Sequence, residues 1–257
     1  MGWLDRFRRV SEPERDPMDE ALRSAKEGDF QAALAIWEPL ARAGNARAQN
    51  NIAACFSGGH GLAENPELAA KWLKLSAAQG DPVGQRNLAT LHFRGEGVEQ
   101  DEAEAMRLYR LAADQGDATA QDMYSWMLAD HEDYAASLAY AERAAAQGVA
   151  ASMTRIGNLH HNALGVERDA GVAAEWWRKA AMLGEADGQA MLGAAHITGA
   201  GVPRDPVAAL VWLLRARDGG SKLAHNFIPA AIAVLSPEER EAAKLRADRP
   251  LLDEGEA

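Results

Sequence analysis

Six glycines recur along this chain at nearly constant intervals, and each one closes a segment of the same kind. Self-similarity at a period of roughly 20–50 residues is typical of a solenoid, whose units cannot bury their apolar faces alone and must stack. The register therefore predicts a stack of about six units. The closing glycines, separated by 36, 36, 32, 36 and 36 residues, are Gly44, Gly80, Gly116, Gly148, Gly184 and Gly220.

The residues before each closing glycine predict a helix. Fifteen positions upstream stands a short polar side chain that can cap a helix N-terminus: Asp29, Asn65, Asp101, Asp133, Asp169 and Asp205. A small residue follows, eleven upstream: Ala33, Ala69, Ala105, Ser137, Ala173 and Ala209. Eight upstream come larger residues: Ile36, Trp72, Leu108, Tyr140, Trp176 and Trp212. Because residues three apart share a helix face, we expect the small residue to admit a neighbouring helix and the large one to fill the groove between repeats. The closing glycine then supplies a left-handed C-cap.

A second periodic stretch precedes each of these helices. In one unit it contains Gln85, Leu88, Ala89 and His92, and it ends in a loop with the pair Gly97-Val98. Apolar positions three and four apart predict an amphipathic helix. Each unit therefore reads as helix A, loop, helix B.

This pattern resembles the Sel1-like repeat, a relative of the tetratricopeptide repeat. The residues that carry the resemblance are the helix A pattern A-Q-x-x-L-G, the loop G-x-G-V and the helix B pattern A-x-x-W-x-x-x-A-A-x-x-G, clearest between Gly84 and Gly116 and between Gly188 and Gly220. The similarity covers about residues 18–220. The units ending at Gly44 and Gly148 are shorter, closer to tetratricopeptide length. The resemblance implies an all-α fold, a right-handed α/α superhelical solenoid of about six helix-pair repeats.

The two ends of the chain depart from the repeat. Pro13 and Pro17 lie among charged residues, so residues 1–17 are predicted to form a flexible segment before the solenoid of residues 18–220. Ser236, Pro237 and Glu239 have the spacing of a capping box, which predicts capping helices over residues 221–249. Residues 250–257 are predicted to be an acidic tail.

Charge and composition exclude several classes of protein. A formal net charge of −11 argues against nucleic-acid binding, which needs clustered cations. No run approaches the roughly 20 apolar residues of a membrane span, and no secretory signal begins the chain. Cys55 is the single cysteine, so an internal disulfide is impossible, and we expect a cytoplasmic location. The alanine- and arginine-rich composition suggests a bacterial chain.

The sequence offers no recognisable catalytic or cofactor site. It lacks a phosphate-binding loop, a Cys-x-x-Cys pair and a His-Glu-x-x-His stretch. His92, His160 and His196 occupy one repeat position, where stacked repeats would hold them about 10 Å apart, against about 2 Å for a metal–nitrogen bond. We therefore expect a non-enzymatic protein without metal or cofactor.

The candidate binding residues follow from the resemblance. In tetratricopeptide-like solenoids helix A lines the concave groove, which implies that certain helix A positions face a partner: Asn50, Arg86, Thr90, Phe93, Asp122, Trp126, Asn158 and His161. Trp126, Phe93 and Arg86 are the strongest candidates, because aromatic and arginine side chains contribute most to binding hot spots. The alternative is a solvated face on which Trp126 serves the core of its own short repeat.

The predicted function is a scaffold or adaptor that holds a protein or peptide segment in the concave groove. A first alternative is a membrane-apposed scaffold, in which Trp3, Leu4 and Phe7, interleaved with arginines, make peripheral membrane contact. A second is a hydrolase-like activity, as ascribed to some secreted relatives, for which the sequence offers no nucleophile or base. The partner's identity and the oligomeric state stay open.

Overall fold

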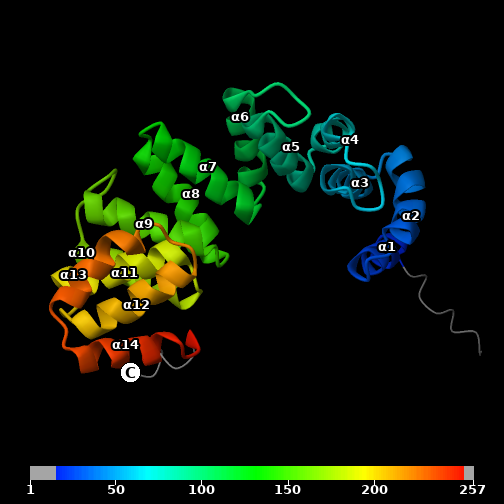
Figure 1. Ribbon diagram of the computed structural model, residues 1–257. Helices are drawn as coiled ribbons and strands as arrows, with labels where there is room; N and C mark the ends of the chain where they lie inside the picture. The colour runs from blue at the N-terminus through cyan, green and yellow to red at the C-terminus, as the bar shows by residue number, and fades with distance from the viewer. Residues whose placement is uncertain (1–15, 252–257) are drawn as a thin grey trace, which may run out of the picture. The chain divides into compact units, whose positions relative to one another are not determined.

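The computed structural model describes residues 16–251, which form fourteen helices and no strand (Figure 1). The chain divides into two compact units, Met1–Gln115 and Gly116–Ala257, and each is described by itself. The first unit contains α1 (Pro17–Lys26), α2 (Phe30–Arg42), α3 (Ala46–Gly58), α4 (Pro66–Ala78), α5 (Pro82–Arg94) and α6 (Glu102–Asp114). The second contains α7 (Ala118–Asp130), α8 (Tyr134–Ala146), α9 (Ala150–Asn162), α10 (Ala170–Met182), α11 (Ala186–Thr198), α12 (Pro206–Asp218), α13 (Ala224–Ala233) and α14 (Pro237–Ala247).

The predicted helix pairs are confirmed. Odd-numbered helices α1 to α11 are the A helices, even-numbered helices α2 to α12 are the B helices, and each pair ends at one of the six closing glycines. The first helix begins at Pro17, capped by Asp16, so the segment predicted to be flexible already contributes a helical residue. The rest of that segment, residues 1–15, and residues 252–257 of the predicted tail lie outside the described residues.

Local chemistry sets the ends of the B helices as predicted. All six expected caps accept a hydrogen bond from a backbone N–H of the first helical turn, as Asn65 does from Leu68 at 2.9 Å. All six closing glycines have a positive φ, and at Gly116 it is +95°. An L-residue with a Cβ adopts this backbone conformation only with strain, which explains glycine at the end of every unit.

The buried seam differs from the prediction at one position. The small residue eleven before each glycine is fully buried in all six repeats. The large residue eight before is buried only at Leu108 and Trp212 and is half-buried at the other four positions. The residue seven before is buried throughout: Trp37, Leu73, Tyr109, Ala141, Trp177 and Leu213. At 3.6 residues per turn, a residue four after the small one points about 40° from it, whereas one three after points about 60° away, so the former lies deeper in the seam.

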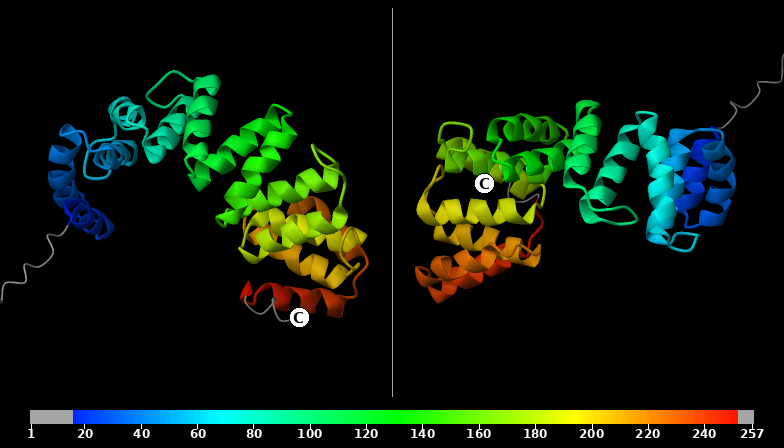
Figure 2. Two further views of the ribbon diagram at one scale, coloured as in Figure 1. Left: turned by 180° about the vertical axis from the view of Figure 1, so that it is seen from behind. Right: turned by 90° about the horizontal axis from the view of Figure 1, so that it is seen from above.

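Successive A helices approach one another more closely than successive B helices do. Within the units, α3 contacts α5, α7 contacts α9, and α9 contacts α11, which in turn contacts α13. No contact of similar extent joins successive B helices of the six repeats in residues 16–251. Closer spacing on one side curves a stack toward that side, so within each unit the A helices lie on the inner face. Figure 2 shows this stacking from two further directions.

The C-terminal helices close the stack of the second unit as predicted. The capping box of Ser236 and Glu239 is formed at the start of α14. Arg215 of α12 is buried, and its guanidinium donates hydrogen bonds to the carbonyls of Arg246, Ala247 and Arg249 at 2.9–3.1 Å. Arg246 and Ala247 are the last two residues of α14 and Arg249 follows it, so Arg215 fastens the end of the cap to the last repeat.

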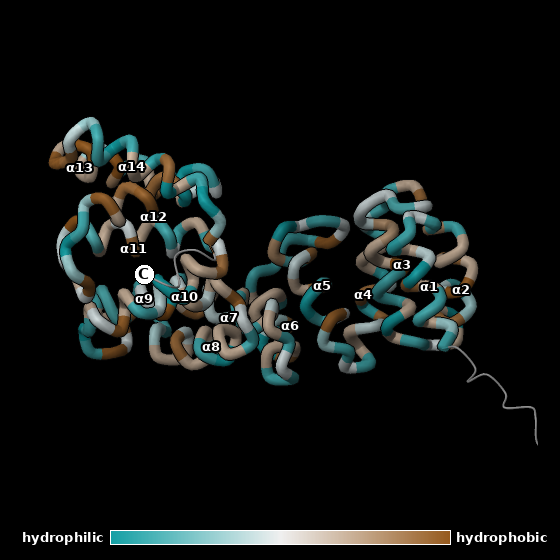
Figure 3. The backbone as a smooth tube through the Cα atoms, turned by 90° about the horizontal axis from the view of Figure 1, so that it is seen from below, coloured by the Kyte–Doolittle hydropathy of each residue, from teal (hydrophilic) through white to brown (hydrophobic). Residues whose placement is uncertain are grey.

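Hydropathy along the backbone alternates between hydrophobic and hydrophilic residues within the helices (Figure 3). None of the helices in residues 16–251 combines the length and the apolar character that a membrane crossing requires.

Candidate functional site

Cavities lie between neighbouring A helices in both units. In the second unit a cavity of about 360 Å³ is bounded mainly by α9, α11 and α13. In the first unit a cavity of about 350 Å³ lies between α3 and α5, and a smaller one of about 140 Å³ lies among α1, α3 and α5. The inner face is therefore hollowed where one repeat meets the next.

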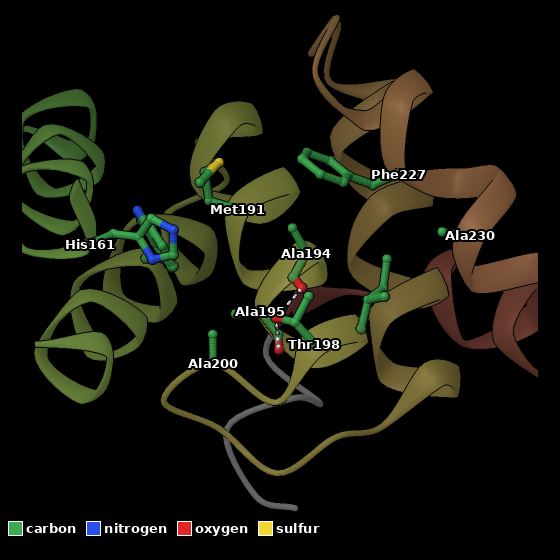
Figure 4. A pocket seen from close by; sticks show the side chains of 10 residues that line it. His161, Met191, Ala194, Ala195, Thr198, Ala200, Phe227 and Ala230 are labelled. Carbon is green, nitrogen blue, oxygen red and sulfur yellow. Dashed lines mark hydrogen bonds between the residues drawn. The ribbon is translucent and has the colours of Figure 1, made fainter.

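The cavity of the second unit is almost entirely apolar, and we call it the apolar pocket. Figure 4 shows His161 entering from α9, Met191 and Ala194 from α11, and Phe227 from α13. Its lining consists of His161, Trp177, Met191, Ala194, Ala195, Ile197, Thr198, Ala200, Phe227 and Ala230. Such a lining suits an aliphatic or aromatic side chain.

Polar groups in the wall of the apolar pocket are mostly bonded within the protein. The Trp177 indole Nε1 donates to Asn158 Oδ1 at 3.0 Å, and the ring lies 5.3 Å from that of His161. The hydroxyl of Thr198 donates back to the carbonyls of Ala194 and Ala195. Nδ1 of His161 is buried without a hydrogen-bond partner among the described residues. The pocket thus presents mainly apolar surface.

The cavity of the first unit is more polar. Asn87 and Thr90 line it, and Arg94 and Glu96 form an exposed ion pair at 3.7 Å at its edge. Asn87 donates from Nδ2 to Asn50 Oδ1 at 2.7 Å, which links α5 to α3. Its polar groups therefore already hold one repeat against the next.

Thr90 and Asn158, two of the predicted binding residues, are bonded to the buried aromatic residue of their own repeat. Thr90 Oγ1 lies 2.9 Å from the hydroxyl of Tyr109, just as Asn158 accepts from Trp177. Burial raises the pKa of Tyr109, because the ionised phenolate would lose its hydration. Where the buried residue is Leu73 or Leu213, which has no polar tip, the matching helix A residue is alanine.

Three further predicted residues also have partners on neighbouring side chains. Asp122 pairs with Arg155 of the next A helix at 2.7 Å and also accepts from the Ser152 hydroxyl. Arg86 Nε donates to Asn87, the residue that bonds Asn50. The contacts of Asn50 with Asn87 and of Asp122 with Arg155 join successive A helices, whereas the bond from Arg86 to Asn87 lies within α5.

The three predicted binding residues with aromatic rings lie in different surroundings. His161 lines the apolar pocket, and Phe93 is half-buried outside the cavities described above. Trp126 is 40% exposed, on the repeat whose buried helix B residue is Ala141, the smallest of the six at that position.

Sequence reasoning missed most of the pocket. The repeat pattern does not point to Met191, Ala200 or Phe227 as lining residues, since they occupy different repeat positions and Phe227 belongs to the cap. The available signal was the apolar α13 following the last closing glycine, because its face had to cover α11. His92, His160 and His196 are half-buried, and residues 16–251 contain no cluster of three His, Cys, Asp or Glu side chains suited to a metal ion.

Comparison with protein families identifies the repeat. The Sel1 repeat family matches residues 46–81, 82–117, 130–149, 150–185 and 186–221, together more than half of the chain. The chain therefore belongs to the Sel1 repeat proteins, solenoids whose fold generally serves protein interaction. The two units that the sequence marked as unusual are the ones matched in part or not at all. A search of curated proteins gave no match.

Solved structures share this architecture. A protective antigen of uropathogenic Escherichia coli with an SLR fold, c5321, is 29% identical with a TM-score of 0.84, and the match covers 90% of this chain and 51% of that one. This chain thus spans about half the length of the E. coli protein. A Sel1 repeat protein from Oxalobacter formigenes has the same fold at 24% identity, with a TM-score of 0.81 and coverage of 91% and 97%.

Proposed function

We propose that this chain is a non-catalytic adaptor that holds a segment of a partner protein against its A-helix face, with the apolar pocket as the anchor site. The observation that carries the proposal is the pocket itself: a concavity of about 360 Å³ between A helices, lined by apolar side chains. Hot spots of protein interfaces lie in such desolvated pockets, and aromatic side chains are prominent among them.

Preorganisation also supports this function. Asp169 and Glu185 cap α10 and α11, Trp177 of α10 is bonded to Asn158 of α9, and α13 packs on α11 and α12. A preformed site loses little conformational entropy on binding, so the ordering of the partner dominates the cost. Cys55 is buried and burial raises its pKa, which suits a thiol that stays reduced in a cytoplasmic location.

The test compares three forms of the full chain in a crosslinked pull-down from native lysate. Ala194→Phe fills the apolar pocket, whereas Leu75→Glu alters an exposed residue on the B-helix α4. Circular dichroism first establishes that all three are equally helical. We expect a partner that wild type and Leu75→Glu retain and Ala194→Phe loses. Equal recovery by all three would overturn the assignment of the A-helix face.

A further inference from the structure

Part of the lining of the apolar pocket lies where two helices end. His161 is the penultimate residue of α9, and Ile197 and Thr198 are the last two of α11, with Ala200 in the loop beyond. The last carbonyls of a helix carry a partial negative charge. The pocket therefore favours an apolar side chain flanked by positive charge over one flanked by acidic groups.

The chain itself contains a segment of this composition. Residues 3–9 read Trp-Leu-Asp-Arg-Phe-Arg-Arg, which places the apolar Trp3, Leu4 and Phe7 beside three arginines. Residues 1–10 carry three arginines against one aspartate, a net charge of +2, so subtraction from the chain total of −11 leaves −13 on residues 11–257. The segment and the remainder of the protein are electrostatically complementary.

We propose that residues 3–9 of one copy bind in the apolar pocket of a second copy, with Trp3 or Phe7 as the anchor. The pocket of a second copy can be reached by this segment however the two units of one chain are placed, and the proposal is therefore intermolecular. Such a contact is heterologous, so its products are head-to-tail chains or rings that grow with concentration.

This inference rests on the same pocket as the proposed function and makes the N-terminal segment a competitor of the partner. The proposed function and this inference can be disproved independently of each other. A partner that Ala194→Phe loses in the pull-down, together with a wild-type protein that never self-associates, would leave the adaptor function standing and overturn self-occupancy.

The first experiment is sedimentation velocity of the full chain over a hundredfold range of concentration. We expect wild type to associate, and Trp3→Ala/Phe7→Ala and Ala194→Phe each to stay monomeric. Ala54→Phe is the matched control, because Ala54 occupies the same repeat position in the first unit, and it should associate like wild type. Mixing the two monomeric variants should yield a one-to-one dimer, since one supplies an intact pocket and the other an intact segment.

A second measurement follows fluorescence anisotropy of a labelled peptide of residues 1–15 added to the Trp3→Ala/Phe7→Ala protein. We expect saturable binding that weakens at least tenfold on Ala194→Phe, or when the peptide's three arginines at positions 6, 8 and 9 are glutamates. Wild type could stay monomeric and yet bind the peptide more weakly than Trp3→Ala/Phe7→Ala does. That result would show that the segment occupies the pocket of its own chain, and it would overturn the proposal of binding to a second copy. A peptide that binds anionic phospholipid vesicles but not the protein would overturn the proposal in favour of membrane contact.

Discussion

The amide Nε2 of Gln79 donates a hydrogen bond to Oε1 of Gln49 at 2.8 Å, while Gln49 Nε2 donates to the carbonyl of Ala41 in the preceding repeat at 3.0 Å. Gln115 with Gln85 and Gln147 with Gln121 repeat the amide pair at the same distance. In the fifth repeat the two positions hold Met153 and Leu183, so both members of the pair are apolar together. The paired amides tie helix B to helix A and helix A to the repeat before.

This relationship predicts that the glutamines are coupled. Gln49→Ala should lower the free energy of unfolding by about 2 kcal/mol, because it removes two hydrogen bonds, one from Gln79 and one to the Ala41 carbonyl. The double change Gln49→Met/Gln79→Leu, which copies the fifth repeat, should cost less than Gln49→Ala alone. Urea unfolding of Gln49→Ala, Gln49→Met, Gln79→Leu and the double variant measures this; strictly additive losses from Gln49→Met and Gln79→Leu would contradict the coupling.

Two glycines should respond differently to alanine. A Cβ on Gly116 would meet open space, so only the strain of its positive φ opposes Gly116→Ala, at about 1 kcal/mol. On Gly157, in α9, it would collide with the Trp177 indole and the carbonyl of Ala173, so Gly157→Ala should cost about 2–3 kcal/mol through overpacking. Thermal unfolding compares the stabilities of the two variants. Intrinsic tryptophan fluorescence should change only for Gly157→Ala, because only this change disturbs Trp177.

The ion pair of Asp122 and Arg155 should contribute far more than an exposed one. The side chains of Asp122 and Arg155 are 17% and 16% exposed. Asp122→Ala removes the carboxylate partner of a poorly hydrated guanidinium, so it should lower the free energy of unfolding by about 2–3 kcal/mol. The control is the pair of Arg94 and Glu96, 61% and 51% exposed, whose coupling should stay below about 0.5 kcal/mol. Double-mutant cycles measure both couplings, and similar values for the two would refute the argument from burial.

Loss of Arg215 should release the cap. Arg215→Met removes three hydrogen bonds to the end of α14, and we expect a loss of about 2–3 kcal/mol. Arg217→Met, two residues along the same helix and exposed, should stay within about 0.5 kcal/mol of wild type. Hydrogen exchange should show lost protection in α14 for Arg215→Met alone; unchanged exchange there would mean that packing by itself holds the cap.

Stability should fall in strong base because of Tyr109. Burial raises the pKa of its phenol in the folded protein above the ordinary value of 10.0. As the pH rises through about 10, the unfolded chain releases this proton before the folded one does, so unfolding becomes more favourable. At pH 8, Tyr109→Phe should lower the free energy of unfolding by about 1 kcal/mol, because the contact with Thr90 is lost. Between pH 9 and 10.5, the free energy of unfolding of this variant should fall less steeply than that of wild type. Denaturant midpoints across that range test this; parallel slopes for both proteins would contradict it.

The architecture was predictable because its signals are local. A cap such as Asn65 acts on N–H groups three residues away, and the positive φ of Gly116 is a property of a single residue. The position of the deepest seam residue was predicted one residue too early, at Trp176 instead of Trp177, because both lie near the apolar face and only packing separates them.

The sequence outlines the face that we propose for binding but not the contacts of its side chains. Cavities lie between the A helices, on which the binding residues were expected, and His161 lines the apolar pocket. Asn158 and Asp122, in contrast, carry polar groups that the sequence presents as free and that the structure bonds to Trp177 and Arg155. A side chain's partner one repeat away cannot be read from its own helix.

The sequence alone thus determined the repeat, its helix pairs, their caps and the closing turns, because each depends on interactions within a few residues of chain. The tertiary structure decided which inner-face side chains are already bonded and where an apolar concavity remains. Phe227 meets His161 and Met191 at one pocket only because α9, α11 and α13 stack, and such stacking joins residues thirty or more positions apart. The packing of whole helices, which no local pattern specifies, sets those distances.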